Sequence, residues 1–474
     1  MKKDGYITVY LSLTIAIMLS FIVTMIEGAR VQTIRFQTEC VMDIGLHSIF
    51  AEYNRELLKQ YGLLGIDTSY GCEVASNERV KFHLLQYMNM NFIAPGQDRL
   101  PNYKDLTAIH ADNAELSKIT YLSDCSGKVL YYQIIQYMKE QTGISYVERI
   151  FDEGEGNSYS QLENQWANNH GKIDSILKKL NMERNEEDEE ISIDNPADQI
   201  KGMKGSFLLD FAVADTGSIL RNQISSSKYI SKRNYEEGAG LWETQTVPFG
   251  IRNRMLFQQY LFDKCGYYRK TKEDAALGYQ LEYLLYGKDN DIDNLNAFAT
   301  QVLKARYVTN AAYLFGNSAK VNEAGTLAVA ITAGIGNPAL TEAVKMTILF
   351  AWCYAESIQD LRILFDGKRA AKIKTDGTWN IPLKELLMFT SGLDSYQEAK
   401  DGKTYEDYLF QFLFQKEEKI KCMRLMDIIE MDIQRKIGNQ FFQMDNCIYQ
   451  LEAEVNISSK YGYGYSITRD YSYE

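Results

Sequence analysis

Residues 6–26 read YITVYLSLTIAIMLSFIVTMI and contain no charged side chain. A head of residues 1–5 (MKKDG) precedes this run, and residues 27–30 (EGAR) follow it. As a helix with a rise of ~1.5 Å per residue, the run extends over ~31 Å, which is enough to cross a hydrocarbon core of ~30 Å. We therefore predict a transmembrane helix over residues 6–27.

The side chains that would anchor this helix are large and apolar. They are Ile7, Val9, Leu11, Leu13, Ile15, Ile17, Leu19, Phe21, Val23 and Ile26. A cleaved signal peptide is not expected. Signal peptides carry small residues just before their cleavage site, whereas cleavage after Gly28 or Ala29 would place Ile26 or Glu27 at a position that needs a small residue. Lysines before the span nearly balance arginines after it, but the head is too short to fold and should stay inside. We expect a single-pass protein of the cell membrane, with a cytoplasmic N-terminus, an extracellular body and the lipid bilayer as a partner.

Apolar residues continue beyond the span at helical spacing. Met42, Leu46, Ile49 and Leu57 recur at intervals that place them on one face, and charged residues take the other face. No proline interrupts residues 30–61, and Gly62 follows them. We predict an amphipathic helix over residues 28–61 that continues the anchor without a break.

Composition narrows the class of protein. The chain has 474 residues, of which 45% are apolar, and a net charge of −12, which argues against a nucleic-acid partner. Its seven cysteines and four histidines are scattered, without a CxxC pair or the spacing of metal ligands. We expect no metal and no cofactor.

The body after the rod mixes helical and strand patterns, so the predicted fold class is α+β. Its expected parts are residues 62–182, an acidic loop or linker at 183–200 that includes ERNEEDEE, and a mostly helical part at 201–474. The expected helices are 77–89, 128–141, 158–180, 207–228, a block at 289–366 broken near Gly316 and at 334–338, and 405–437. The expected strands are 63–67, 105–122, 255–268 and 277–286.

The C-terminal residues predict an antiparallel hairpin. Apolar and polar residues alternate over 447–457 and again over 461–473, on either side of a short turn. One face of the second strand carries Tyr461, Tyr463, Tyr465, Tyr471 and Tyr473. This face either covers a core or forms an interaction surface, and the pattern leaves both interpretations open.

No motif in the chain predicts a reaction. Residues 334–339 (GIGNPA) fit a dinucleotide fingerprint, but the flanking sequence is helical and offers no second strand, so a helix–helix corner is the simpler interpretation. The runs at 324–335 and 344–355 are too short to span a bilayer and predict buried helices. We expect neither a nucleotide partner nor an enzyme.

Several short segments resemble an uncharacterised clostridial family of pilin-like (TadE/TadG-like) membrane-anchored proteins associated with tight-adherence (Flp-type) pilus and secretion clusters. The segments are GYITVYLSL at 5–13, EGAR at 27–30, AEY at 51–53, YGL at 61–63, DCSG at 124–127 with Gln133 and YMK at 137–139, and NPAL at 337–340 with AES at 355–357. The resemblance implies a role in building a surface appendage, with other pilus or secretion proteins as partners.

The resemblance also implies processing between Gly5 and Tyr6, because prepilins are cut after a glycine. The sequence departs from the prepilin pattern at Tyr10, which occupies the position where prepilins carry a glutamate that pairs with a neighbouring subunit. We therefore expect a non-enzymatic, pilin-like accessory acting by protein–protein contacts at the cell surface. The alternatives are a membrane-tethered extracellular hydrolase and a surface adhesin or ligand-binding module.

Overall fold

The computed structural model describes residues 4–93, 107–152, 206–213, 216–240, 249–333, 338–388 and 398–473. Two compact units arise from interleaved parts of the chain. The first contains residues 1–134, 234–247 and 433–474, and the second contains 135–233 and 248–432. The helix expected at 158–180, the acidic segment at 183–200 and the corner at 334–337 lie outside the described residues.

The first unit is a helix-on-sheet structure, and it confirms the α+β class. Its elements are α1 (Asp4–Phe50), α2 (Arg55–Tyr61), β1 (Ile66–Asp67), α3 (Asn77–Phe92), β2 (Ile109–Tyr121), the start of α4 (Asp124–Asp152), the 3₁₀ turn Met444–Asn446, β5 (Cys447–Ser459) and β6 (Gly464–Ser472). Strand β5 lies in the middle of the sheet and pairs antiparallel with β1, β2 and β6. The expected C-terminal hairpin is therefore β5–β6, with Val455 opposite Ile467.

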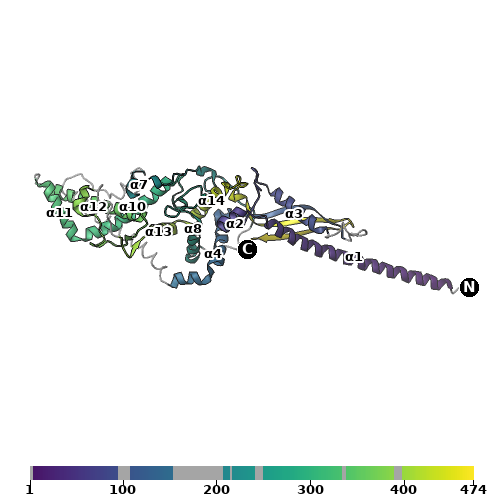
Figure 1. Cartoon of the computed structure of the whole chain (residues 1–474). Coiled ribbons are helices and arrows are strands. Elements are labelled where there is room, and N and C mark those ends of the chain that lie inside the picture. The colour runs from purple at the N-terminus through teal and green to yellow at the C-terminus, as the bar shows by residue number, and fades with distance from the viewer. Residues whose placement is uncertain are drawn as a thin grey trace. The chain divides into compact units, whose positions relative to one another are not determined.

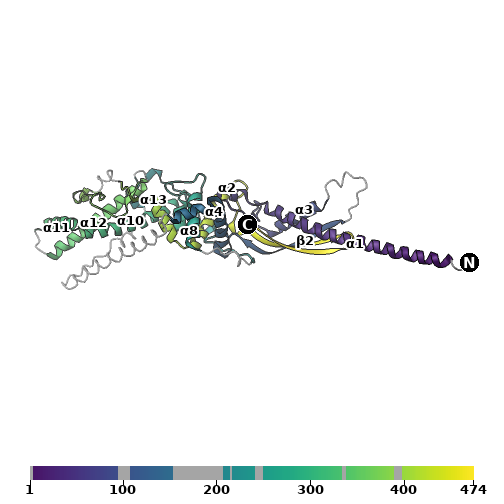
Figure 2. The same cartoon turned by 90° about the horizontal axis from the view of Figure 1, so that it is seen from below.

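Helix α1 lies along the sheet for only half of its length. Figures 1 and 2 show the N-terminal half running on beyond the ends of the strands. The covered half and strand β6 match in length, because the 24 residues from Glu27 to Phe50 rise ~35 Å and the eleven from Tyr463 to Tyr473 extend ~34 Å. Hydrogen bonds from Tyr463 to Glu27 and from Tyr473 to the Phe50 carbonyl join the helix and the hairpin at the two ends of this length.

The expected continuous helix to Tyr61 is wrong, because the chain breaks after Phe50. Asn54 has extended backbone and caps a separate helix, with its side-chain oxygen accepting the backbone N–H groups of Glu56 and Leu57, each at 3.1 Å. Gly62 ends α2 at a φ of 69°, as a left-handed C-cap residue does. A strong N-cap residue within an otherwise helical pattern was the signal for this break.

The second unit is mainly helical. Its elements are the rest of α4, α7 (Ser206–Ala212), the 3₁₀ turns Thr216–Ser218, Ser226–Lys228 and Leu383–Met388, α8 (Ile251–Lys264), α9 (Gln280–Tyr286), α10 (Asp291–Gly316), α11 (Ser318–Thr332), α12 (Pro338–Phe365), the short pair β3 (Ala370–Ala371) and β4 (Gly402–Lys403), α13 (Tyr405–Gln415) and most of α14 (Glu418–Gln434). Helices α10, α11 and α12 share a core that contains Leu314, Ala328 and Trp352. The helical block that ends near Asp366, with its break near Gly316, is confirmed.

Four expectations in this unit are wrong. Most of residues 255–268 and 277–286 lie in helices α8 and α9 rather than in strands, and residues 405–437 contain two helices, α13 and α14. The helix expected at 207–228 ends at Ala212, because residues 222–224 instead make backbone hydrogen bonds to residues 289–291. The break after Gln415 is held by Arg254, whose guanidinium donates to the Phe414 carbonyl and, at 2.8 Å, to Glu418.

Candidate functional site

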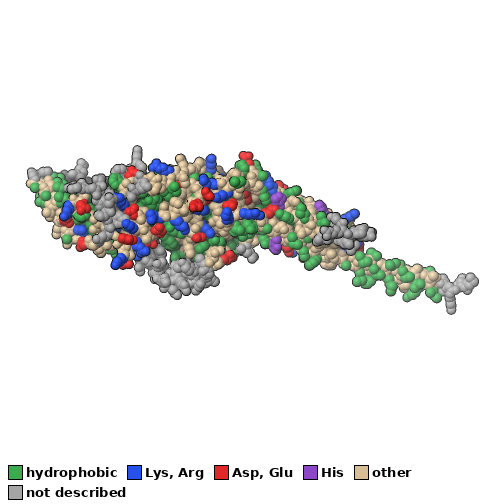
Figure 3. All heavy atoms as spheres, in the orientation of Figure 1, with side chains coloured by type: hydrophobic (Ala, Val, Ile, Leu, Met, Phe, Trp, Pro, Cys, Tyr) green, Lys and Arg blue, Asp and Glu red, His purple; other side chains and the backbone are tan. Residues whose placement is uncertain are grey.

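The free half of α1 exposes an apolar surface on all sides. Each predicted anchor residue is exposed, from 49% for Ile15 to 68% for Ile7. Figure 3 shows this part of the helix as green side chains without blue or red among them. Among the described residues α1 is the one helix that is long and apolar enough to cross a membrane, and none of its apolar window is buried. Exposed apolar surface of this extent indicates contact with a membrane or a partner.

Three hydroxyl groups within the apolar run of this helix donate hydrogen bonds to its own backbone. Ser12 donates to the Val9 carbonyl at 2.9 Å, Thr14 to the Leu11 carbonyl at 2.9 Å, and Thr24 to the Ser20 carbonyl at 2.8 Å. A buried hydroxyl without a partner is costly in lipid, whereas these intrahelical bonds remove that cost. These three hydroxyl groups are therefore compatible with a hydrocarbon environment.

The cover on α1 begins where the apolar run ends. Glu27 pairs with Arg30 at 2.7 Å and accepts a hydrogen bond from the Tyr463 hydroxyl at 2.8 Å. The Arg30 guanidinium carbon lies 4.2 Å from the centre of the Tyr461 ring. The turn of the β5–β6 hairpin thus meets the helix one residue after Ile26.

Further along, α1 is packed against α3 and the sheet. Met42, Leu46 and Ile49 are buried, as the amphipathic pattern predicted. Gly45 allows close approach of α3, because a Cβ atom there would lie 2.9 Å from the Met88 side chain. This half of the helix is therefore part of the domain core.

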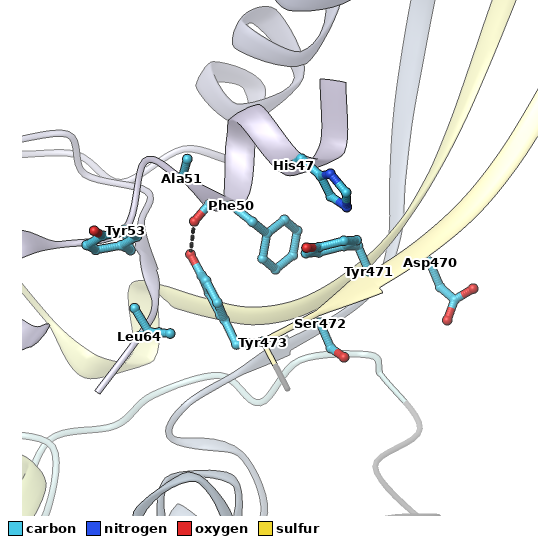
Figure 4. A pocket seen from close by; sticks show the side chains of 9 residues that line it. All are labelled: His47, Phe50, Ala51, Tyr53, Leu64, Asp470, Tyr471, Ser472 and Tyr473. Carbon is cyan, nitrogen blue, oxygen red and sulfur yellow. Dashed lines mark hydrogen bonds between the residues drawn. The ribbon is translucent and has the colours of Figure 1, made fainter. Parts of the chain in front are cut away.

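The predicted tyrosine surface is largely occupied by α1. Tyr473 donates its hydroxyl to the Phe50 carbonyl at 2.7 Å, and the Tyr471 ring lies 4.6 Å from the Phe50 ring and 5.0 Å from that of His47 (Figure 4). Burial raises the pKa of Tyr473 well above its ordinary value. Tyr463 and Tyr465 are half-buried, and Tyr461 remains 43% exposed. Of the two open interpretations, the core-covering one describes most of this face.

Described residues of the first unit line two surface cavities. One of about 540 Å³ is the site in Figure 4, lined by His47, Phe50, Ala51, Tyr53, Leu64 and Asp470–Tyr473. Another of about 520 Å³ is lined by Glu236, Glu237 and Asp445 together with Asn77, Leu116–Ile119, Tyr121, Asn234, Tyr235, Gly238, Ala239 and Asn446. Glu236 and Glu237, which line this second cavity, are exposed to solvent.

The DCSG segment, residues 124–127, forms a hydrogen-bonded turn beside this second cavity. Cys125, Ser126 and Gly127 have φ values of 54°, 59° and 80°, a left-handed turn at the start of α4. Asp124 accepts the backbone N–H groups of Gly238 and Tyr121, both at 2.9 Å. Burial raises the pKa of Asp124 to about 6, although these two hydrogen bonds oppose the shift. The segment holds residues 238–240 against the edge of β2.

Glu52, in the turn after α1, is the centre of a hydrogen-bonded cluster, the Glu52 cluster, that the sequence did not predict. Glu52 accepts hydrogen bonds from the hydroxyls of Tyr70 and Tyr87, at 2.6 and 2.7 Å, and lies 2.9 Å from Nδ1 of His83. Its partners come from 18 to 35 positions away in the sequence, so no local spacing could have grouped them. The Glu52 cluster connects the turn after α1 to α3.

The second unit contains a buried network of charges. Asp360 accepts from Arg306 at 2.8 and 2.9 Å and lies 2.7 Å from the Lys374 ammonium, which also pairs with Glu356. All four side chains are at most 1% exposed. Burial would raise the pKa of Asp360, but the charges of Arg306 and Lys374 outweigh it and hold that pKa below its ordinary value. The network contains two charges of each sign, so its charges balance one another in the interior of the unit.

Metal chemistry finds no support in the described part of the chain, where no group of three or more His, Cys, Asp or Glu side chains could hold an ion. None of the seven cysteines, all of them among the described residues, forms a disulfide, and Cys40, Cys72 and Cys125 are exposed. The predicted cleavage position between Gly5 and Tyr6 lies at the start of α1.

Comparison with known proteins gives one family. Residues 185–459 match a family of unknown function, DUF5702. Neither a curated protein nor a solved structure matches the chain. The match covers 58% of the 474 residues, since 185–459 comprises 275 positions.

Proposed function

Because the chain belongs to DUF5702, a family of unknown function, we propose its role from the resemblance of its short segments to pilin-like proteins and from the structure of α1: it is a non-enzymatic, membrane-anchored, pilin-like component of a surface assembly of the tight-adherence pilus or secretion type. One observation carries the proposal. A single helix exposes an apolar, membrane-length half and buries its other half against an antiparallel sheet of the same chain.

This division of α1 supports an anchor that positions a body, rather than a detachable leader. The residues after Ile26 contribute to the core through Met42, Leu46 and Ile49. Removing the helix would expose the tyrosine face of β6 and the α3 residues that pack against it. Anchor and body therefore act as one piece, in the way a pilin-like subunit holds its domain at a membrane.

The proposed mode of action is protein–protein contact outside the membrane. Tyr10 is 70% exposed in the apolar span and carries no charge to pair with a neighbouring subunit's amino terminus. We therefore assign an accessory role in the assembly and not that of the repeating pilus subunit. The N-terminal head is cytoplasmic and the body extracellular in this proposal.

Crosslinking in intact cells tests the assembly role. The full chain, Ile17→Arg and Ile437→Arg are each crosslinked at the cell surface and analysed by mass spectrometry. Ile17 lies in the apolar span, whereas Ile437 is 97% exposed in a turn of the body and provides a matched control.

We expect the full chain and Ile437→Arg to crosslink to components of a pilus or secretion apparatus, and Ile17→Arg to lose those crosslinks. Crosslinks confined to unrelated proteins, or unchanged by Ile17→Arg, would contradict the proposal.

A further inference from the structure

The turn of the β5–β6 hairpin, residues 459–463, lies at the boundary between the two halves of α1. Tyr463 reaches Glu27 and Tyr461 reaches Arg30, through the contacts of 2.8 and 4.2 Å described above. Glu27 follows the last exposed apolar residue of the span, Ile26. The turn is thus tied to the helix at the level where its apolar surface ends.

Helix geometry places these contacts within the depth of a lipid headgroup layer. Glu27 and Arg30 stand one and four residues past Ile26, or ~2 and ~6 Å along the axis at ~1.5 Å per residue. The headgroup region on each side of a bilayer is ~5–8 Å deep, from a total of ~40–45 Å and a core of ~30 Å. If residues 6–26 fill the core, the turn meets the membrane surface.

The side chains of the turn suit that layer. Tyr461 and Tyr463 offer an apolar ring and a polar hydroxyl, the combination enriched at membrane interfaces, and Lys460 is exposed beside them. Tyr6 and Tyr10, 83% and 70% exposed, provide aromatic rings at the opposite end of the span. Glu27, the acidic group described in contact with the turn, is neutralised by Arg30.

The turn is also held rigidly, so that its side chains keep their level. The Ser459 N–H donates to the Tyr463 carbonyl at 2.8 Å, and the Gly462 N–H donates to the Ser459 carbonyl at 2.9 Å. Gly462 has a φ of 84°, which a residue with a Cβ atom rarely adopts. The Lys460 N–H donates to the Ala108 carbonyl at 3.1 Å, which ties the turn to the start of β2.

We infer that residues 459–463 rest on the lipid surface, with Tyr461 and Tyr463 in the headgroup layer and Lys460 beside anionic headgroups. This inference rests on the proposed membrane anchor. A second contact point beside the helix limits how far the body can tilt or rotate, because interfacial aromatic and basic residues set such angles. The hairpin therefore orients the body relative to the bilayer.

Photo-crosslinking to lipid tests the contact. The full chain is reconstituted in nanodiscs of equimolar phosphatidylcholine and phosphatidylglycerol, with benzoylphenylalanine placed singly at Tyr461, Lys460, Ile15 or Thr468. Thr468 is exposed on β6 and lies five residues, or ~17 Å of strand, beyond Tyr463. Illumination followed by intact-mass measurement reports lipid adducts.

We expect adducts from positions 461, 460 and 15, at least fivefold above position 468. Adducts from position 15 but not from 461 or 460 would overturn the inference and leave the anchor standing. An absence of adducts at all four positions would instead reject the anchor and the inference together. The probe at 460 replaces an exposed side chain, so loss of folding at 461 does not decide the outcome.

Discussion

Replacing Asp360 with asparagine keeps the shape of the side chain but removes its charge from the buried network. Arg306 and Lys374 would then face Glu356 alone, which leaves one uncompensated positive charge among side chains that are at most 1% exposed. Breaking a buried ion pair in this way typically costs ~3–5 kcal/mol, against a total stability of ~5–15 kcal/mol for a domain. We expect the free energy of unfolding of the second unit to fall by ~3–5 kcal/mol.

Urea unfolding of the full chain in detergent micelles measures this change. Trp352 and Trp379 lie in the core beside the network, where Trp352 donates to the Ile381 carbonyl at 2.7 Å, so their fluorescence reports on this unit. Asp376→Asn is the matched control, because its carboxylate is exposed and should leave the transition nearly unchanged. A loss below ~1 kcal/mol for Asp360→Asn would refute the idea that charge pairing holds this core together.

Three further changes probe other elements. Burial raises the pKa of Glu282 from 4.5 to about 7, so the folded state binds more protons than the unfolded state between these pH values. The free energy of unfolding therefore falls as pH rises through this range, by up to ~3 kcal/mol, and Glu282→Gln should remove this dependence in urea titrations at several pH values. An unchanged pH dependence in Glu282→Gln would contradict a raised pKa of Glu282. Asn54→Ala removes the N-cap of α2 and should lower the free energy of unfolding by ~1–2 kcal/mol, measured by thermal unfolding. Unaltered thermal unfolding would show that the cap does not stabilise the fold. Ile17→Arg places a charge near the middle of the span at a cost of ~2.5–3.5 kcal/mol, so it should shift protein from the membrane to the soluble fraction, whereas equal partition of Ile17→Arg and Ile437→Arg would oppose a membrane role for that segment.

The sequence predicted those parts of the fold that depend on the pattern of residues close together in the chain. The span is evident from an uncharged run of membrane length, and the hairpin from alternation over residues 447–473. Both signals come from neighbours in the chain. They also located the amphipathic stretch of α1, where Met42, Leu46 and Ile49 are buried.

Helices α8 and α9 were predicted as strands because their Tyr, Leu and Phe content outweighed their spacing. In α8 the buried residues Leu256, Phe257, Tyr260 and Leu261 recur at helical intervals, so a signal was present. In α9 six of the seven residues are buried, and no period can show which structure such a run adopts.

Long-range pairing lay beyond any local pattern. Strand β5 pairs with β2, so Ile109 meets Ser459 across 350 positions of sequence. Arg306 and Asp360 are 54 residues apart, and the Glu52 cluster draws its partners from α3 and the loop before it. The tyrosine face illustrates the same point, because alternation identified it but only the folded chain shows that α1 covers it.

Membrane extraction combined with protease treatment of intact cells tests the central claim most directly. We predict that the full chain stays in the membrane pellet after washing with alkaline carbonate, and that protease added to intact cells degrades the body while a fragment containing residues 6–26 remains with the membrane. Release of the chain by carbonate, or a body fully protected in intact cells, would contradict an anchored protein whose body lies outside.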